Sequence, residues 1–222
     1  MLDERVLAIG VDIGGTFTDL VLVDEARRTI HSTKILTTPQ EPERAVLDGV
    51  RRILETVGRT ADGIRTLVHG TTLATNAIIE RKGAQTLLLT TKGFRDVLET
   101  RTELRYDLYD LFITFPEPLV PRRRRIGVTE RVTYDGAVET PLVRDDVLAA
   151  LEAEAADGSE YVAVCFLLSY TNPAHEAEAK AIIQEARPDL PVTLSTDVLP
   201  EIGEYGSVST TVANAYVQPI ID

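Results

Sequence analysis

Residues 12–19 read Asp-Ile-Gly-Gly-Thr-Phe-Thr-Asp and combine carboxylates, two glycines and two hydroxyls between two apolar runs. Glycines allow a tight reversal and a close approach of the backbone to a ligand, so that successive N–H groups point at phosphate oxygens. We therefore expect a β-hairpin whose turn binds phosphate through Gly14, Gly15, Thr16, Phe17 and Thr18. Asp12 is the candidate catalytic carboxylate and the expected ligand of Mg²⁺ or Mn²⁺. The alternative is an ordinary hairpin in which Gly-Gly only suits the turn.

A second polar motif, His69-Gly70-Thr71-Thr72, stands where an expected short strand runs into an expected helix. The N-terminus of a helix binds anions through its free N–H groups and its dipole. Simple capping by Thr71 or Thr72 explains the threonines equally well without a ligand. Asn76 lies one turn into this helix on the face of Thr72, and we expect it to face the same cleft as Asp12.

Other catalytic chemistries are not indicated. The three histidines are far apart in sequence and match no zinc-ligand spacing. No Gly-x-Ser-x-Gly nucleophile motif occurs. Cys165 is the only cysteine, so no intramolecular disulfide can form, and its apolar neighbours at 161–168 predict a buried, inert thiol in a strand.

The elements that must position these motifs follow an α/β order. The first part predicts three short strands, an amphipathic helix, a strand, a second helix and a buried strand, at about 6–11, 18–23, 29–35, 45–57, 67–68, 73–82 and 85–89. Three antiparallel strands followed by helix, strand, helix and strand are typical of a ribonuclease-H-like half-domain. We therefore assign residues 1–92 to such a half-domain, which carries the phosphate hairpin.

The remainder divides into three segments. Residues 93–141 have no clean period and predict an irregular insertion followed by a hairpin, and an irregular stretch of this length is usually functional or interacting. Residues 142–200 alternate between helical and strand patterns and predict βα units with a parallel sheet. Residues 201–222 predict a helix that begins a further, truncated domain.

Composition excludes some partners. The net charge of −12 argues against nucleic acid, because phosphate backbones are bound by positive surfaces. The exception is Arg122–Arg125, which we interpret as a solvated strand entry or a local anion contact. No stretch approaches the ~20 apolar residues of a membrane span, and the charged start is not a signal peptide. We expect a protein with no membrane partner, located in the cytoplasm.

These motifs together resemble the hydantoinase/oxoprolinase family, specifically the N-terminal region of N-methylhydantoinase A-type subunits, and also acetone carboxylase subunits. The resemblance runs in order through almost the whole chain, over Val11–Asp19, His69–Gly83, Thr91–Glu99, Tyr109–Arg123, Val162–Pro173, Ser195–Pro200 and Thr210–Pro219.

The resemblance implies an ATPase of the actin/hexokinase/Hsp70-like superfamily, with ATP held between two related domains. It implies ATP-dependent opening of a small cyclic amide such as a hydantoin or 5-oxoproline, together with a hydantoinase B-type partner subunit or domain. Alternatives are a carboxylase subunit of the acetone carboxylase type and a nucleotide-binding or assembly module without turnover. Members of the family are several times longer, so we expect this chain to be an N-terminal fragment that is inactive by itself.

Overall fold

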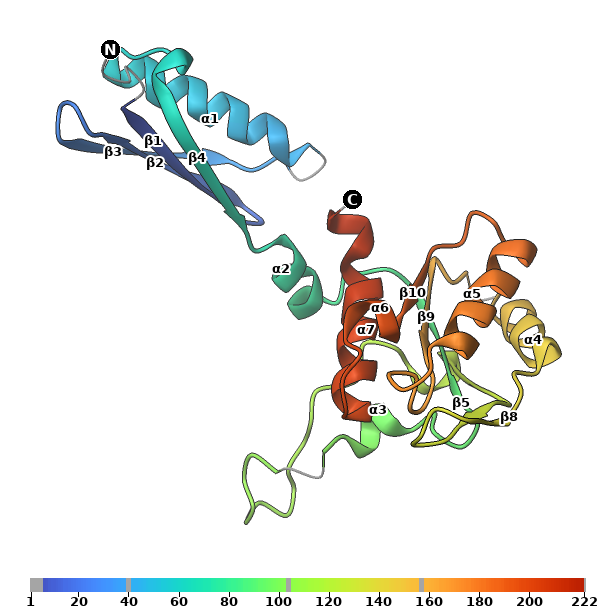
Figure 1. The fold of residues 1–222 in the computed structure, drawn as a ribbon. Helices are drawn as coiled ribbons and strands as arrows, with labels where there is room; N and C mark the ends of the chain where they lie inside the picture. Colours follow the sequence, from blue (N-terminus) through green and yellow to red (C-terminus); the bar gives the residue numbers. More distant parts are fainter. Residues whose placement is uncertain (1–5, 39–40, 103–104, 156–157, 222) are drawn as a thin grey trace. The chain divides into compact units, whose positions relative to one another are not determined.

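The computed structural model describes residues 6–38, 41–102, 105–155 and 158–221 and divides the chain into two compact units, Met1–Glu80 and Arg81–Asp222. The charged start, residues 1–5, lies outside the described residues. Figure 1 shows that each unit has its own sheet with helices packed on it. The first unit contains, in chain order, β1 (Leu7–Ile13), β2 (Phe17–Asp24), β3 (Thr29–Leu36), α1 (Pro42–Val57), η1 (Ala61–Gly63), β4 (Ile64–Thr71) and α2 (Leu73–Glu80).

In the first unit the strand order is β3-β2-β1-β4. The strands β1, β2 and β3 pair antiparallel, whereas β4 runs parallel to β1. Because side chains alternate between the two faces of a strand, every second residue of β1 points into the core. That core lies between the sheet and α1, which covers one face (Figure 1), and consists of Leu7, Ile9, Val11, Ile13, Leu20, Leu22, Ile53 and Leu54.

The buried carboxylate of Asp24, at the end of β2, links this strand to Arg59, which follows the end of α1. Asp24 accepts hydrogen bonds from the Arg27 N–H at 2.9 Å and from Arg59 Nε at 2.9 Å. Burial raises the pKa of Asp24, but these donors and the charges of the two arginines outweigh it, and the pKa lies below its ordinary value of 3.8. The helix itself ends at Gly58, whose φ of 64° is the left-handed conformation that glycine adopts without strain.

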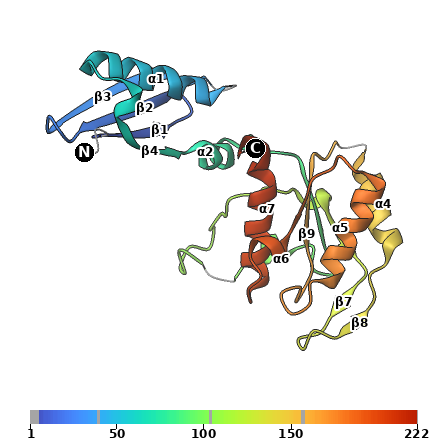
Figure 2. The same ribbon diagram turned by 45° about the horizontal axis from the view of Figure 1, so that its top comes forward.

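The second unit contains β5 (Thr86–Thr91), α3 (Val97–Thr100), η2 (Arg122–Arg124), β6 (Arg125–Val128), β7 (Arg131–Val132), β8 (Val138–Thr140), α4 (Arg144–Ala155), β9 (Tyr161–Cys165), α5 (Ala174–Ala186), β10 (Val192–Leu194), α6 (Ser195–Val198) and α7 (Glu204–Ile221). Four strands form a parallel sheet in the order β10-β9-β5-β6, and β7 pairs with β8 in a separate hairpin. Figure 2 shows α7 on one face of this sheet and α4 with α5 on the other.

The strand β5 is buried at all six positions, as expected for a central strand of a sheet covered on both faces. The sequence placed this strand at the end of the first unit, within residues 1–92. In the structure it pairs with β6 and β9 in the second unit, and the first unit ends at Glu80.

The arginine run at 122–125 is not a solvated strand entry throughout. Arg124 and Arg125 are 5% and 1% exposed, and Arg125 donates from Nε to the Val120 carbonyl at 2.9 Å and pairs with Glu99. Of the two interpretations, the solvated strand entry is therefore wrong for these two residues. Acceptors of the chain itself bind their guanidinium groups: Gln85 Oε1 for Arg124, and the Val120 carbonyl and the Glu99 carboxylate for Arg125. Within the described ranges no helix is long and apolar enough to span a bilayer.

Candidate phosphate-binding site

The parallel pairing of β1 and β4 brings the two polar motifs together. Asp12 lies opposite Gly70 in the ladder, and Ile13 lies opposite Thr71. The backbone N–H of Thr72 donates to the Ile13 carbonyl at 3.2 Å. Both strands therefore end at the same edge of the sheet, where the turn after β1 adjoins the start of α2. All the residues predicted from the two motifs lie within this first unit.

Backbone and hydroxyl groups hold the turn between β1 and β2. The Gly14 N–H donates to the Phe17 carbonyl at 3.0 Å, and the Thr37 N–H donates to the Thr16 carbonyl at 3.0 Å. The Thr37 hydroxyl donates to the Gly14 carbonyl at 2.8 Å and lies 2.9 Å from the Thr18 hydroxyl. Thr18 is fully buried, so in this structure its hydroxyl supports the turn from within the fold.

Sequence reasoning missed Thr37 because it lies outside the motif. The available signal was the strand register: β3 pairs with β2 so that Leu36 stands opposite Phe17, which places the next residue, Thr37, beside the turn. Extending the expected antiparallel pairing of the third strand with the second by one residue places Thr37 beside the turn.

The fold requires glycine for space at Gly14, whereas at Gly15 it has room for a small side chain. Neither Gly14 nor Gly15 has a positive φ. A Cβ on Gly14 would lie 2.9 Å from the Phe17 carbonyl oxygen, a distance that real Cβ atoms do not adopt. A Cβ on Gly15 would lie 3.4 Å from Asn76 Nδ2, and Gly15 is otherwise exposed. The missing side chains therefore leave the backbone of the turn open beside the start of α2.

The start of α2 is capped by its own threonines. The Thr71 hydroxyl accepts a hydrogen bond from the Leu73 N–H at 3.2 Å, and the Asn76 N–H donates to the Thr72 carbonyl at 2.8 Å. Asn76 Nδ2 also donates to the Thr72 hydroxyl at 3.3 Å, so these two side chains share a face as expected. His69, Gly70, Thr71 and Thr72 are all exposed. Capping accounts for Thr71, and the exposed residues around it are compatible with an anion.

Asp12 is exposed on the face of β1 opposite the core. Its cross-strand neighbour Asp19 forms an ion pair with Lys34 at 3.0 Å, and the Lys34 Nζ also lies 5.0 Å from the centre of the Phe17 ring. Among the described residues, no hydrogen bond or ion pair is recorded for the Asp12 carboxylate, and no three histidine, cysteine or acidic side chains gather as a metal cage. Mg²⁺ bound with a nucleotide takes one or two protein carboxylates and completes its shell with water and phosphate oxygens. A single exposed carboxylate beside the turn fits that requirement.

The second unit holds a buried polar network that the sequence did not reveal. The Glu176 carboxylate accepts hydrogen bonds from the Phe166 N–H at 2.9 Å, the Ser195 hydroxyl at 2.6 Å, and the Thr196 N–H and hydroxyl at 3.0 Å. His175 Nδ1 lies 2.8 Å from a Glu130 oxygen. Each of these groups is matched within the fold, so the network joins the carboxyl ends of β9 and β10 to α5.

Comparison with known proteins places these features in context. A family model described as the hydantoinase/oxoprolinase N-terminal region matches residues 8–187. The alpha subunit of caprolactamase from Pseudomonas jessenii is 36% identical over 99% of this chain and 32% of its own length. The 5-oxoprolinase of Saccharomyces cerevisiae is 32% identical over 97% of this chain and 20% of its own length.

Solved structures agree with the sequence relatives. ATP-dependent caprolactamase from Pseudomonas jessenii aligns with a TM-score of 0.83 at 36% identity, over 96% of this chain and 32% of that one. The nucleotide-free structure of acetone carboxylase aligns with a TM-score of 0.84 at 26% identity and the same coverages. The expected α/β fold of the actin/hexokinase-like ATPase type is thereby confirmed. The chain spans about a third of the length of caprolactamase and acetone carboxylase and a fifth of the length of the 5-oxoprolinase.

Proposed function

We infer the function of this chain from its family: it belongs to the hydantoinase/oxoprolinase family, whose N-terminal region matches residues 8–187. We propose that it forms part of the ATP site of a cytoplasmic enzyme that opens a small cyclic amide in a reaction coupled to ATP hydrolysis. A hydantoinase B-type subunit or domain is the proposed partner. The observation that carries the proposal is the open glycine turn beside the start of α2, in a chain 36% identical to an ATP-dependent caprolactamase.

The proposed chemistry explains why ATP is needed. Resonance stabilises an amide carbonyl against attack by water. Transfer of the γ-phosphoryl group from ATP to the carbonyl oxygen gives ADP and makes that oxygen a leaving group. Attack of water on the same carbon, followed by cleavage of the ring C–N bond with a proton passing to the nitrogen, gives a ring-opened acyl phosphate. A second water hydrolyses this acyl phosphate, so one cyclic amide, one ATP and two waters give the amino acid, ADP and phosphate. The protein's contribution to phosphoryl transfer is positioning and charge stabilisation.

We assign roles to the predicted residues within this scheme. The backbone N–H groups of Gly15 and Thr16 bind phosphate oxygens, while Gly14 closes the turn through its N–H and keeps the approach free of a side chain. Phe17 packs beside Lys34 at the edge of the turn. Thr18 supports the turn through Thr37.

The start of α2 supplies the second set of contacts. His69, Gly70, Thr71, Thr72 and Asn76 line the side of the site formed by this helix terminus. Asp12 would hold Mg²⁺ or Mn²⁺, and the metal would supply positive charge where negative charge develops during transfer.

One observation favours a second candidate function. The chain aligns with acetone carboxylase as closely in structure as with caprolactamase, so an ATP-dependent carboxylase subunit is the alternative. Phosphorylation of a ketone oxygen and phosphorylation of an amide oxygen both require the turn to bind the phosphates of ATP. The turn therefore does not distinguish the two substrates.

The deciding experiment uses the full-length protein together with its partner subunit. ADP release is measured with Mg-ATP alone and after addition of caprolactam, 5-oxoproline, a hydantoin, or acetone with bicarbonate. We expect one of the cyclic amides to stimulate ADP release and to be opened in equal amount. Stimulation by acetone with bicarbonate would establish the carboxylase alternative instead. An assembly that binds ATP without turnover on any of these compounds would contradict both enzymatic assignments.

A further inference from the structure

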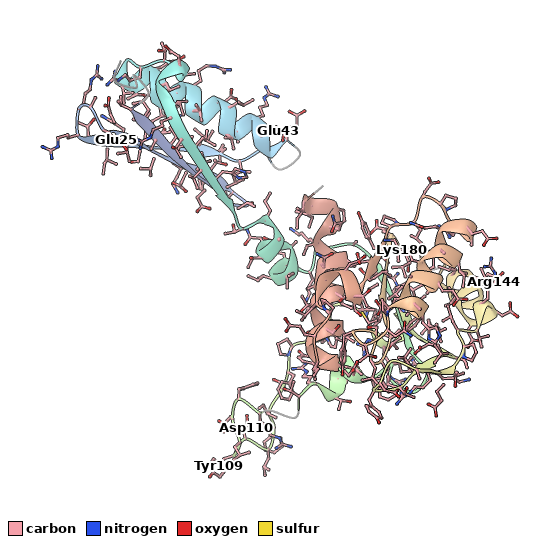
Figure 3. The ribbon with its side chains drawn as sticks, viewed as in Figure 1. Glu25, Glu43, Tyr109, Asp110, Arg144 and Lys180 are labelled. Atoms are coloured by element: carbon pink, nitrogen blue, oxygen red, sulfur yellow. The ribbon has the colours of Figure 1, made fainter. Side chains whose placement is uncertain are left out.

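A loop in the second unit exposes an unusual concentration of large apolar side chains. We define the aromatic loop as residues 105–116, between α3 and η2. Figure 3 shows its labelled residues Tyr109 and Asp110 at the end of the loop, directed away from the helices of the second unit. Five large side chains close together in sequence are from 69% to 90% exposed: Tyr106, Leu108, Tyr109, Leu111 and Phe112.

Contacts within the aromatic loop fix its shape. The Tyr106 hydroxyl donates to the Thr114 carbonyl at 2.6 Å, and the Tyr106 ring meets Phe115 edge to face at 5.6 Å between centroids. Arg101 lies over the Phe115 ring at 4.2 Å and donates to the Pro116 carbonyl at 2.6 Å. The base of the loop is therefore cross-linked by aromatic, cationic and hydrogen-bonding contacts.

Two aspartates order the end of the loop. Asp107 accepts a hydrogen bond from the Tyr109 N–H at 3.1 Å, and Asp110 accepts one from the Phe112 N–H at 2.8 Å. Such Asx turns set the backbone locally. A recognition element that is already ordered loses less conformational entropy when it binds. Exposed apolar patches on an ordered element mark interaction sites, and aromatic side chains dominate the energetics of such interfaces.

The exposed area is of the size that an interface needs. A buried aromatic side chain removes about 150–250 Å² from water, so Tyr106, Tyr109 and Phe112 together account for roughly 500 Å². One partner in a standard interface contributes about 800 Å². The three rings could thus supply more than half of one side of a standard interface, and Leu108 and Leu111 expose further apolar area.

Charge selects the kind of partner. The chain carries a net charge of −12, and the loop contributes Asp107 and Asp110 against one arginine, Arg105. Association of two copies of this chain would bring like charges together, whereas a partner with a basic rim would be attracted. The related caprolactamase chain is named as the alpha subunit of its enzyme, so it assembles with a different chain.

We propose that the aromatic loop, residues 105–116, is the docking element for the second subunit of the enzyme and inserts into an apolar groove rimmed by basic side chains on that subunit. This inference rests on the proposed function, which supplies the partner. The rings of Tyr109 and Phe112 fill the groove, and Asp107 and Asp110 face its basic rim.

The test uses the full-length chain and the separately purified second subunit, mixed and followed by sedimentation velocity. The loop variant is Leu111→Ser with Phe112→Ser. The control is Tyr134→Ser with Ile202→Ser, which removes two other side chains of the second unit that are 84% and 86% exposed. We expect the loop variant to weaken assembly at least tenfold and the control to leave it unchanged. Assembly of the unaltered chains should also weaken as the salt concentration rises.

Three results would overturn the proposal. Assembly as tight for the loop variant as for the control would show that the loop does not dock the second subunit. A lower melting temperature of the full-length chain alone, with assembly unchanged, would show that the loop packs within the chain. Loss of self-association by the chain alone would show that the occupant is a second copy. Binding of Mg-ATP to the full-length chain is measured separately and should be the same for both variants, so a failure of the proposed function remains distinguishable.

Discussion

Replacement of Gly15 by alanine tests whether the turn between β1 and β2 binds phosphate. The added Cβ would lie 3.4 Å from Asn76 Nδ2, which is an ordinary contact, and Gly15 does not have a positive φ. The fold should therefore tolerate Gly15→Ala with a change in unfolding free energy of less than about 1 kcal/mol. The same methyl group occupies the space that a phosphate oxygen needs beside the backbone N–H groups.

The size of the effect follows from the contact that is lost. A hydrogen bond to a charged group contributes about 1.5–3 kcal/mol. Loss of one such bond lowers the affinity for Mg-ATP roughly tenfold to a hundredfold. Gly15→Val should lower it further, because a β-branched side chain fills more of the same space. The assay is isothermal titration of the full-length protein with Mg-ATP, accompanied by a circular-dichroism melt of each variant.

Gly10→Ala is the matched control. Gly10 lies on β1, the strand that leads into the turn; it is exposed, and a Cβ there would meet nothing within 4 Å. We expect this variant to bind Mg-ATP as the unaltered protein does. Unchanged affinity in a folded Gly15→Ala protein would refute the phosphate assignment, and an equal loss in both variants would show that the effect is not specific to the turn.

Further outcomes are expected at three other positions. Asp12→Asn should reduce turnover about a hundredfold or more while changing the Mg-ATP dissociation constant by less than about threefold, because the metal matters most as charge develops; near-normal rates at limiting Mg²⁺ would make this carboxylate structural. The lowered pKa of Asp24 means that its stabilising contribution is complete above its ordinary pKa of 3.8 and is lost as the pH falls toward the lowered value. Urea unfolding between pH 6 and pH 3 should therefore lose stability less steeply in Asp24→Asn, and identical slopes would contradict the assignment. Burial, and next the nearby Glu176, raise the pKa of the Cys165 thiol, so a thiol reagent at pH 8 should modify it only after unfolding; rapid modification of the native protein would show that this strand opens.

Local patterns in the sequence predicted the elements well where periodicity and end signals agree. The helix at Ala174–Ala186 and the strand at Val192–Leu194 belong to the alternating helices and strands that the sequence predicts over residues 142–200. That helix begins after Pro173, and the Asn172 side chain just before it accepts a hydrogen bond from the Ala174 N–H at 3.0 Å. These features depend on neighbouring residues, which a sequence pattern reports directly.

Features that depend on pairing between distant segments were not predictable in this way. A buried run such as Leu87–Leu89 indicates a strand but does not identify its neighbours, which is why β5 was placed in the first unit. The burial of Thr18 depends on Thr37, and the burial of His175 depends on Glu130; in both cases the partner lies on another element. The candidate site could be proposed from sequence because its main motif is contiguous, whereas Thr37, which braces the turn, lies on another segment and was not predicted.

The position of β5 at the centre of its sheet has a consequence for synthesis of the chain. Its inner residues Leu87, Leu88 and Leu89 are at most 1% exposed, and its partner β9 lies about 75 residues further along. At about 5–20 residues per second, a ribosome takes roughly 4–15 s to make that stretch. During this interval the nascent chain exposes an apolar strand whose edge toward β9 has no hydrogen-bonding partner. Translation speed between residues 92 and 160, and the availability of chaperones in that interval, should therefore determine how much of the protein reaches its native state.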